Sequence, residues 1–127
     1  MFLLKKKVYY HHTDTVGVVY YGRYLEFLED ARTEFFYSKN IDVGLHSEEG
    51  TQFVIISVEI KYKRPARYLD EIDISAEVEN FTASTIHFKQ KVFKGETLLV
   101  EADVVLACVG KDFKPKRLPL SVKENLR

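Results

Sequence analysis

The feature that most constrains the fold of this 127-residue chain is a period-two alternation of apolar and polar residues through its second half. EIDISAEVEN, residues 71–80, sets Ile72, Ile74, Ala76 and Val78 against three acids and a serine. Successive side chains of a β-strand point to opposite faces, so this alternation predicts a strand with one buried face. The same reasoning predicts strands in QFVIISVEIKYK, STIHFKQKVF and TLLVEADVVLACVG, with an opening strand in LLKKKVYY.

Residues 23–39 break this period and predict one long helix. Tyr24, Leu28, Ala31 and Phe35 recur at spacings of four, three and four residues, which places them on one helix face. Acidic side chains take much of the other face, and those near the start suit the positive end of the helix. One long helix and about five mostly antiparallel strands predict an α+β fold in which the helix packs on a sheet.

Glycine and proline mark the connections. KGE at residues 94–96 separates the last two strands and predicts a hairpin. Pro65 predicts a bend or a sheet edge, because proline cannot donate a hydrogen bond to a strand ladder. The chain holds no repeat and no linker, so we expect one domain over residues 1–127. Residues 115–127 lose the periodicity and contain two of the three prolines, which predicts a surface tail.

The first and last of the long strands carry more specific expectations. Alternation in the first predicts a shared face for Val54, Ile56, Val58, Ile60 and Tyr62. In the last, apolar residues occupy one face at Leu98, Val100, Ala102, Val104 and Leu106, and the other at Leu99, Val105, Ala107 and Val109. A strand that is apolar on both faces needs cover on both sides, and a single helix covers five long strands poorly. We therefore expect the chain to self-associate, at least as a dimer.

Composition excludes several classes of function. Basic and acidic residues number 19 each, so the net charge is zero and nothing favours nucleic acid as a partner. Cys108 is the single cysteine; it excludes an internal disulfide and fits a reducing cytoplasm, and its apolar surroundings favour a buried strand residue over a reactive thiol. No stretch has the order of a signal peptide or the length of a membrane span. We therefore expect a cytoplasmic protein.

The chemistry-bearing segment is HHTDTVGVVYYGRYLEFLEDARTEFF, residues 11–36. It places Asp14 three residues before Gly17, in the connection that leads into the helix. Glycine permits a sharp turn or close approach to a ligand, and unpaired N–H groups at a helix start can hold an oxyanion. An acid beside such donors can act as nucleophile or general base in acyl transfer. A turn or helix-cap role for Asp14 stays open on spacing alone.

The stretch HTDTVGVVYYGRYLEFLEDAR resembles the signature of hotdog-fold acyl-CoA thioesterases of the 4-hydroxybenzoyl-CoA thioesterase family. It is most similar to the small bacterial acyl-CoA thioesterases associated with the Tol-Pal system. The matching positions are Asp14, Gly17, Val18, Val19, Tyr20, Glu29, Ala31 and Arg32. YKRPARYLDEIDI, residues 62–74, also resembles the central strands of that family.

The resemblance implies a hotdog fold, in which a curved antiparallel sheet wraps a long central helix. It implies edge-to-edge dimers with active sites at their interface, often paired into tetramers. The implied reaction is hydrolysis of a short-chain, aromatic or fatty acyl-CoA, with Asp14 as nucleophile or general base and no cofactor or metal. Gly17, Val18 and Val19 are implied near the N–H groups that polarise the thioester carbonyl.

One position departs from the family pattern. Relatives carry His after the Val-Val-Tyr run, whereas this chain has Tyr21. A phenol with a pKa near 10 stays protonated at neutral pH, so Tyr21 is expected to donate a hydrogen bond rather than shuttle a proton. Tyr10 matches a tyrosine near the active site of these relatives and is a second candidate.

Other residues admit a functional and a structural interpretation. His11 and His12 suggest a metal site, but adjacent residues of an extended chain point apart and no further ligand follows at suitable spacing. Some hotdog thioesterases of another branch use a helical glutamate for catalysis, which makes Glu29 a candidate by resemblance. Here a pair with Arg32 one turn later is geometrically reasonable and favours a structural role. Arg64 belongs to a basic group that suits CoA phosphates, or forms a solvated patch.

Fold alone does not determine the reaction. The alternative to an enzyme is a non-catalytic hotdog protein that binds acyl-CoA or acts as a scaffold for partner proteins. Release of thiol from acyl-CoA, dependent on Asp14, distinguishes the two.

Overall fold

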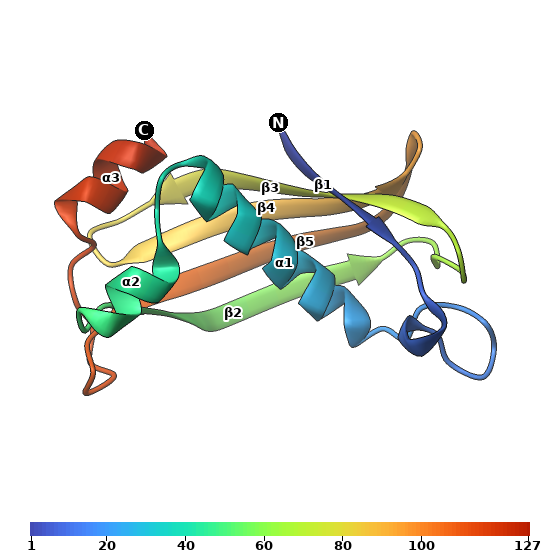
Figure 1. Cartoon of the computed structure of the whole chain (residues 1–127), viewed down its shortest axis with the longest axis horizontal. Coiled ribbons are helices and arrows are strands. Elements are labelled where there is room, and N and C mark those ends of the chain that lie inside the picture. Colours follow the sequence, from blue (N-terminus) through green and yellow to red (C-terminus); the bar gives the residue numbers. More distant parts are fainter.

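The computed structural model describes residues 1–127 as one antiparallel sheet wrapped around one long helix (Figure 1). The five strands run in the order β1-β3-β4-β5-β2 across the sheet. Their bounds are β1 Phe2–Lys7, β2 Gln52–Tyr62, β3 Glu71–Phe81, β4 Thr85–Lys94 and β5 Thr97–Val109. The helical segments are η1 Tyr10–His12, α1 Arg23–Ser38, α2 Val43–Glu48 and α3 Leu120–Leu126. This is the predicted α+β hotdog architecture, and the long helix lies within one residue of the predicted range.

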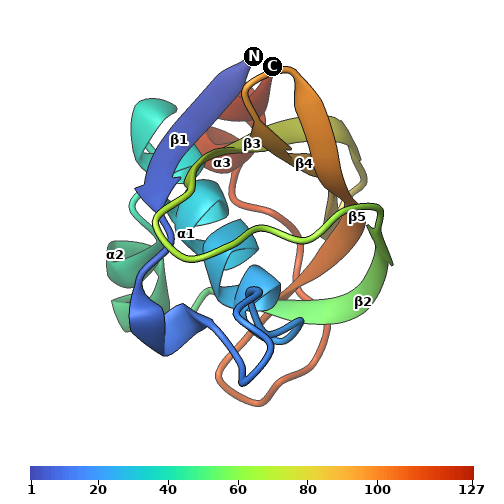
Figure 2. The same cartoon turned by 90° about the vertical axis from the view of Figure 1, so that its right-hand side faces the viewer.

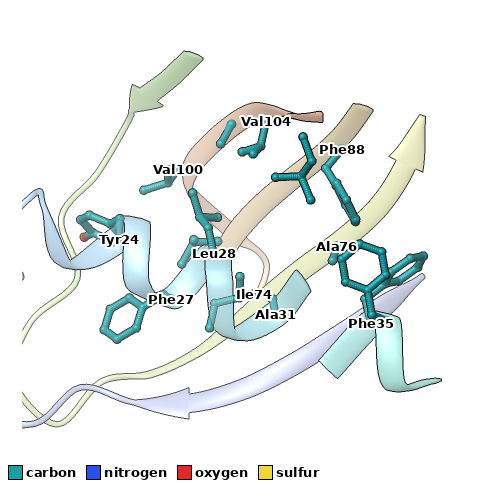
Figure 3. Close-up of a cluster of buried hydrophobic side chains, with 14 of the residues drawn as sticks. Tyr24, Phe27, Leu28, Ala31, Phe35, Ile74, Ala76, Phe88, Val100 and Val104 are labelled. Carbon is teal, nitrogen blue, oxygen red and sulfur yellow. The ribbon is translucent and has the colours of Figure 1, made fainter. Parts of the chain in front are cut away.

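The sheet curves around α1, as the end view in Figure 2 shows. The face of α1 that periodicity predicts to be buried is buried: Tyr24, Leu28, Ala31 and Phe35 all belong to the core. In Figure 3 Leu28, Ala31 and Phe35 of α1 lie beside the labelled side chains of the sheet. Twenty-four buried residues form this one cluster. The core therefore sits between the helix and the concave face of the sheet.

A β-bulge in β2 overturns the predicted single face of that strand. Ile55 and Ser57 lie opposite neighbouring residues of β5, so Ile56 is an extra residue. Before the bulge, the odd-numbered residues Phe53 and Ile55 of β2 lie opposite buried side chains of β5. After the bulge, the even-numbered residues from Val58 onward do so. Val54 therefore does not share a face with Val58, because an extra residue reverses the alternation.

The outer face of β5 is not uniformly apolar. Glu101 and Asp103 occupy its centre, and the strand register places them opposite Lys91 and Lys89 of β4. Charged cross-strand pairs therefore cover the middle of this face, and the apolar residues of that side lie toward the strand ends. The apolar residues on the outer face of β5 therefore do not by themselves require that a second chain cover this face.

The predicted connections are present. Lys94 pairs with Thr97, and the two residues between them form the hairpin turn, with Gly95 at a φ of 59°. Residues 63–70 form no strand around Pro65. None of the helices is both long enough and apolar enough to span a lipid bilayer.

The predicted surface tail at residues 115–127 is wrong, because this segment packs on the core. α3 buries Val122 completely, and Leu118 just before it is also buried. Leu126 packs against the same cluster. Proline obscured the pattern: Pro119 occupies the N-cap of α3, and a helix of 7 residues is too short to show a clear period.

We expect Leu118→Ala to lower the free energy of unfolding by about 2–4 kcal/mol, because it leaves a cavity in the core. Leu120, 69 % exposed in α3, provides the matched control. Leu120→Ala should change stability by less than about 0.5 kcal/mol. Urea unfolding of both variants tests this, and equal effects would contradict the packing of the C-terminal segment.

Candidate active site

The connection between η1 and α1 is a tight loop built around Asp14 and Gly17. The Asp14 N–H donates to the Val18 carbonyl at 2.9 Å, and the Gly17 N–H donates to the Asp14 carbonyl at 3.1 Å. Gly17 has a φ of 87°, which a residue with a side chain rarely adopts. One carboxylate oxygen of Asp14 accepts the Val16 N–H at 2.9 Å. Asp14 is therefore a turn residue by its local geometry, with an exposed carboxylate.

The segment around Pro65 holds this loop against the helix. The Val19 N–H donates to the Ala66 carbonyl at 2.8 Å. The Ala66 N–H in turn donates to the Tyr24 hydroxyl at 3.0 Å. Val19, Tyr24 and Ala66 are all buried. The loop is thus fixed at one end of α1 by contacts from a segment distant in sequence.

Several N–H groups near the start of α1 have no acceptor within the chain. Val18, Tyr21 and Gly22 donate no hydrogen bond, and Gly22, the N-cap, has no side chain to cap the helix. The N–H groups of Gly17 and Val19 are engaged as described above. Gly17, Val18 and Val19 were expected near the donors, and of these only Val18 has a free N–H group. Tyr21 and Gly22, just before α1, provide two more.

A cavity of about 210 Å³ lies beside this helix start. Its lining residues are Val19, Tyr21, Tyr24, Tyr62, Lys63, Arg64 and Pro65. The Tyr62 hydroxyl donates to the Tyr21 carbonyl at 3.2 Å. The rings of Tyr24 and Tyr62 lie 5.6 Å apart. Three tyrosines from the loop, the helix and the end of β2 thus form one wall.

Only part of the predicted site is gathered at this cavity. Tyr21, Val19 and Arg64 line it, whereas Asp14, Tyr10, Gly17 and Val18 do not. Tyr10 is highly exposed and packs edge-on against Tyr68. Tyr24, Tyr62 and Pro65 were not predicted as site residues. The one signal in the sequence was an aromatic residue at a strand end, Tyr62, directly before two basic residues and the bend at Pro65.

The phenols of this wall are held in their protonated form. Burial raises the pKa of Tyr24, and the hydrogen bond from Ala66 only partly opposes this. Burial also raises the pKa of Tyr62, and the neighbouring Tyr21 adds to the effect. At neutral pH both hydroxyl groups therefore remain neutral. The Tyr24 hydroxyl keeps its O–H available as a donor, whereas the Tyr62 hydroxyl already donates to the Tyr21 carbonyl.

The two adjacent histidines do not point apart. Residues 10–12 form a 3₁₀ turn rather than an extended strand, and the rings of His11 and His12 lie 4.0 Å apart. His12 Nδ1 accepts the Tyr9 N–H at 2.9 Å, and its ring packs edge-on against Phe27. No three His, Cys, Asp or Glu side chains gather closely enough to hold a metal ion. His12 thus anchors the η1 turn to the helix.

The expected Glu29–Arg32 pair is also absent. Glu29 is exposed, and Arg32 donates instead to the Gln90 side chain at 2.9 Å. No carboxylate lies within ion-pair distance of Arg32. The buried face of α1 therefore turns Arg32 inward, away from the acids of the exposed face.

Comparisons with known proteins agree on one family. A family model described as the thioesterase-like superfamily matches residues 8–126. The acyl-CoA thioester hydrolase YbgC of Escherichia coli O6:H1 is 36% identical over 118 residues, covering 91% of this chain and 88% of that protein. The acyl-CoA thioesterase YbgC of Haemophilus influenzae is 38% identical over 120 residues, covering 92% and 88%.

Solved structures give the same result. A probable thioesterase from Bartonella henselae superposes with a TM-score of 0.88 at 33% identity, covering 92% of this chain and 98% of that one. A hypothetical protein from Aquifex aeolicus superposes with a TM-score of 0.95 at 27% identity, covering 100% of both chains. The chain thus aligns with these proteins over almost its whole length.

The environment of His12 predicts a pH-dependent stability. Burial, followed by the positive charges of His11, Lys6 and Arg23, lowers the pKa of His12 below its usual value. As pH falls below about 6.5, the unfolded chain binds this proton before the folded chain does, so the free energy of unfolding decreases. We expect urea unfolding at pH 7.5 and pH 5.5 to show this loss.

His12→Gln should reduce the difference between the two pH values. His46→Gln, a change in the short helix α2, is the control and should keep the wild-type difference. An unchanged pH dependence in the His12 variant would remove this residue from the explanation.

Proposed function

This chain belongs to the thioesterase-like superfamily and is an acyl-CoA thioester hydrolase, and we propose that Asp14 supplies its catalytic carboxylate. The supporting observation is the position of an exposed carboxylate in a rigid loop next to unpaired N–H groups at a helix start. One oxygen of Asp14 is held by the Val16 N–H, which fixes the carboxylate and leaves its other oxygen free for a reacting group. The loop geometry thereby serves catalysis as well as the turn.

The free N–H groups of Val18, Tyr21 and Gly22 are the proposed donors to the thioester oxygen. Negative charge develops on that oxygen when the carbonyl carbon is attacked, and fixed donors stabilise it more than the ground state. The N-terminal end of α1 adds a favourable dipole. Tyr62 assists indirectly, because its hydrogen bond to the Tyr21 carbonyl fixes the peptide that leads into the helix.

Water is the second substrate. Asp14 either attacks the thioester carbon to form an anhydride that water then hydrolyses, or removes a proton from the water that attacks. Both routes consume one water and release a carboxylic acid and the thiol of CoA. Rapid-quench mass spectrometry distinguishes them, because only the first produces a covalent acyl-enzyme at Asp14.

Arg64 is the proposed contact for CoA phosphate. Its guanidinium takes part in no ion pair, whereas the neighbouring Lys63 lies 3.9 Å from Glu101. A free guanidinium at the rim of the tyrosine-lined cavity suits bidentate binding of phosphate oxygens. The apolar and aromatic wall is the complementary surface for the acyl group or the pantetheine arm.

A second copy of the chain is the proposed partner that completes the site. One sheet edge, β1, is short and carries three lysines, which discourages strand pairing. The other edge, β2, has 11 residues and exposes Ile55 and Ile56. Pairing along β2 forms a dimer, and pairing of dimers forms a tetramer. The end of β2 lines the cavity through Tyr62, so the dimer contact extends into the site.

We also propose a cytoplasmic location. Cys108 is buried and unpaired, as is usual in a reducing compartment. Burial raises the pKa of this thiol, which keeps it protonated and unreactive.

Asp14→Asn is expected to lower kcat for thiol release by at least about 10²-fold, because the amide neither attacks nor accepts the proton. The assay is release of CoA thiol from short-chain, aromatic and long-chain acyl-CoAs. The preferred acyl class is the one with the highest kcat/KM.

The chain contains a matched control. One carboxylate oxygen of Asp112 accepts the Lys114 N–H at 3.0 Å, the same contact with the N–H two residues later that Asp14 makes with Val16. Asp112→Asn should leave kcat unchanged. Full activity of the Asp14 variant would overturn the proposed mechanism, and tight binding of acyl-CoA without turnover in the wild type would favour the non-catalytic alternative.

Tyr21→Phe is expected to lower kcat/KM by about 3- to 10-fold, the value of one lost hydrogen bond. Tyr21 is largely exposed, so the change should not alter the unfolding midpoint. Tyr21→His should retain or raise activity, because a histidine can donate a hydrogen bond and exchange a proton near neutral pH. Loss of folding in either variant would show that Tyr21 has a packing role instead.

A further inference from the structure

Arg32 is a buried cation with no anionic partner. Its side chain lies on the inner face of α1, and the residue is 5% exposed. The one hydrogen bond it donates, from Nη1, goes to the side-chain oxygen of Gln90. Gln90 is neutral and fully buried, and its amide donates to the carbonyls of Leu28 and Ser75. Arg32 therefore forms no ion pair, and the carboxylate that shares its surroundings is that of the exposed Glu29.

This arrangement is unusual because buried charges are normally paired. Burial lowers the pKa of Arg32, opposed by the carboxylate of Glu29, but a guanidinium keeps its proton in proteins. Every side-chain nitrogen or oxygen sealed from solvent has a hydrogen-bond partner, whereas Nε and Nη2 of Arg32 make no hydrogen bond. These two atoms are therefore open to solvent although the residue is nearly buried.

The opening is a cavity of about 200 Å³ between α1, α2 and β2. Figure 1 shows these three elements together, at the end of the sheet opposite the Asp14 loop. The cavity has an apolar wall and two charged residues, Arg32 and the exposed Glu29. Its apolar wall consists of Phe36, Val43, Phe53 and Leu106, together with Ile55.

We propose that this cavity binds the carboxylate end of a short apolar chain. A guanidinium binds a carboxylate through two parallel hydrogen bonds, and Nε and Nη2 are the free donors for them. The apolar wall takes the hydrocarbon part. The ligand is either the distal carboxylate of a substrate acyl group, which rests on the proposed function, or a free carboxylic acid.

This site is separate from the tyrosine-lined cavity within one chain. Tyr24 and Arg32 are eight residues apart on α1, which corresponds to about 12 Å along the helix. The two cavities share no lining residue. Binding at Arg32 can therefore be measured independently of hydrolysis at Asp14.

The test is calorimetric titration of the wild-type protein with hexanoate and with hexanol, which have the same chain length. We expect hexanoate to bind at least 10-fold more tightly than hexanol, and Arg32→Met to abolish that preference. Glu29→Gln should tighten hexanoate binding, because it removes a competing anion. The matched control Arg117→Met replaces an exposed arginine and should bind as the wild type does.

A second variant distinguishes a loss of the binding site from a folding defect in Arg32→Met. Val43→Phe fills the cavity from α2 and leaves Arg32 and Gln90 in place, so it should weaken hexanoate binding at an unchanged unfolding midpoint. Equal binding of hexanol and hexanoate, or unchanged binding in Val43→Phe, would overturn the proposal.

Kinetics with adipoyl-CoA and hexanoyl-CoA identify the source of the carboxylate. If the site binds the distal carboxylate of the substrate, kcat/KM for adipoyl-CoA relative to that for hexanoyl-CoA falls at least 10-fold in Arg32→Met. If it binds free acids, the ratio stays constant while hexanoate binding is lost. Asp14→Asn should still bind hexanoate, so a failure of the hydrolytic mechanism and a failure of this site give different results.

Discussion

A single helix has to cover one face of a five-stranded sheet, and the rest of the structure follows from that constraint. Five strands at about 4.8 Å spacing span about 19 Å, whereas a helix with its side chains is about 10–12 Å wide. A flat sheet would leave its outer strands uncovered. The sheet instead curves around α1, and the bulge in β2 contributes to that curvature by bending the edge strand. The short helix α3 covers the remaining end of the core through Val122.

The same packing positions the candidate active site. Because Tyr24 is buried at the start of α1 and accepts a hydrogen bond from Ala66, the segment around Pro65 is fixed against the helix start. Val19 then joins the Asp14 loop to that segment. The peptides just before the helix, at Tyr21 and Gly22, keep their N–H groups free, because no carbonyl or side chain of this segment accepts from them. Core packing therefore fixes the position of the Asp14 loop, which is itself exposed.

Arg32 and Gln90 show how one helix combines core packing with polar chemistry. Gln90 connects α1 to β3 by donating to one carbonyl of each, and it accepts from Arg32. Such a network specifies how the helix sits on the sheet, because each buried group needs its partner. Periodicity alone assigns Arg32 to a pair with Glu29, three residues earlier. The structure selects Gln90, 58 residues away, because the inward face of the helix is opposite β4.

Local pattern alone determined the long helix, the strands and the hairpin at Gly95, and the resemblance of residues 12–32 to a known family added Asp14 as the candidate carboxylate. These features depend on residues within a few positions of one another, where backbone geometry links sequence to structure directly. Only the tertiary structure decided the reversal of faces at Ile56, the packing of α3, and the meeting of Tyr21, Tyr24 and Tyr62 at one cavity. Each of these depends on contacts between segments distant in the chain, and alternation or helical spacing carries no information about which distant segments meet.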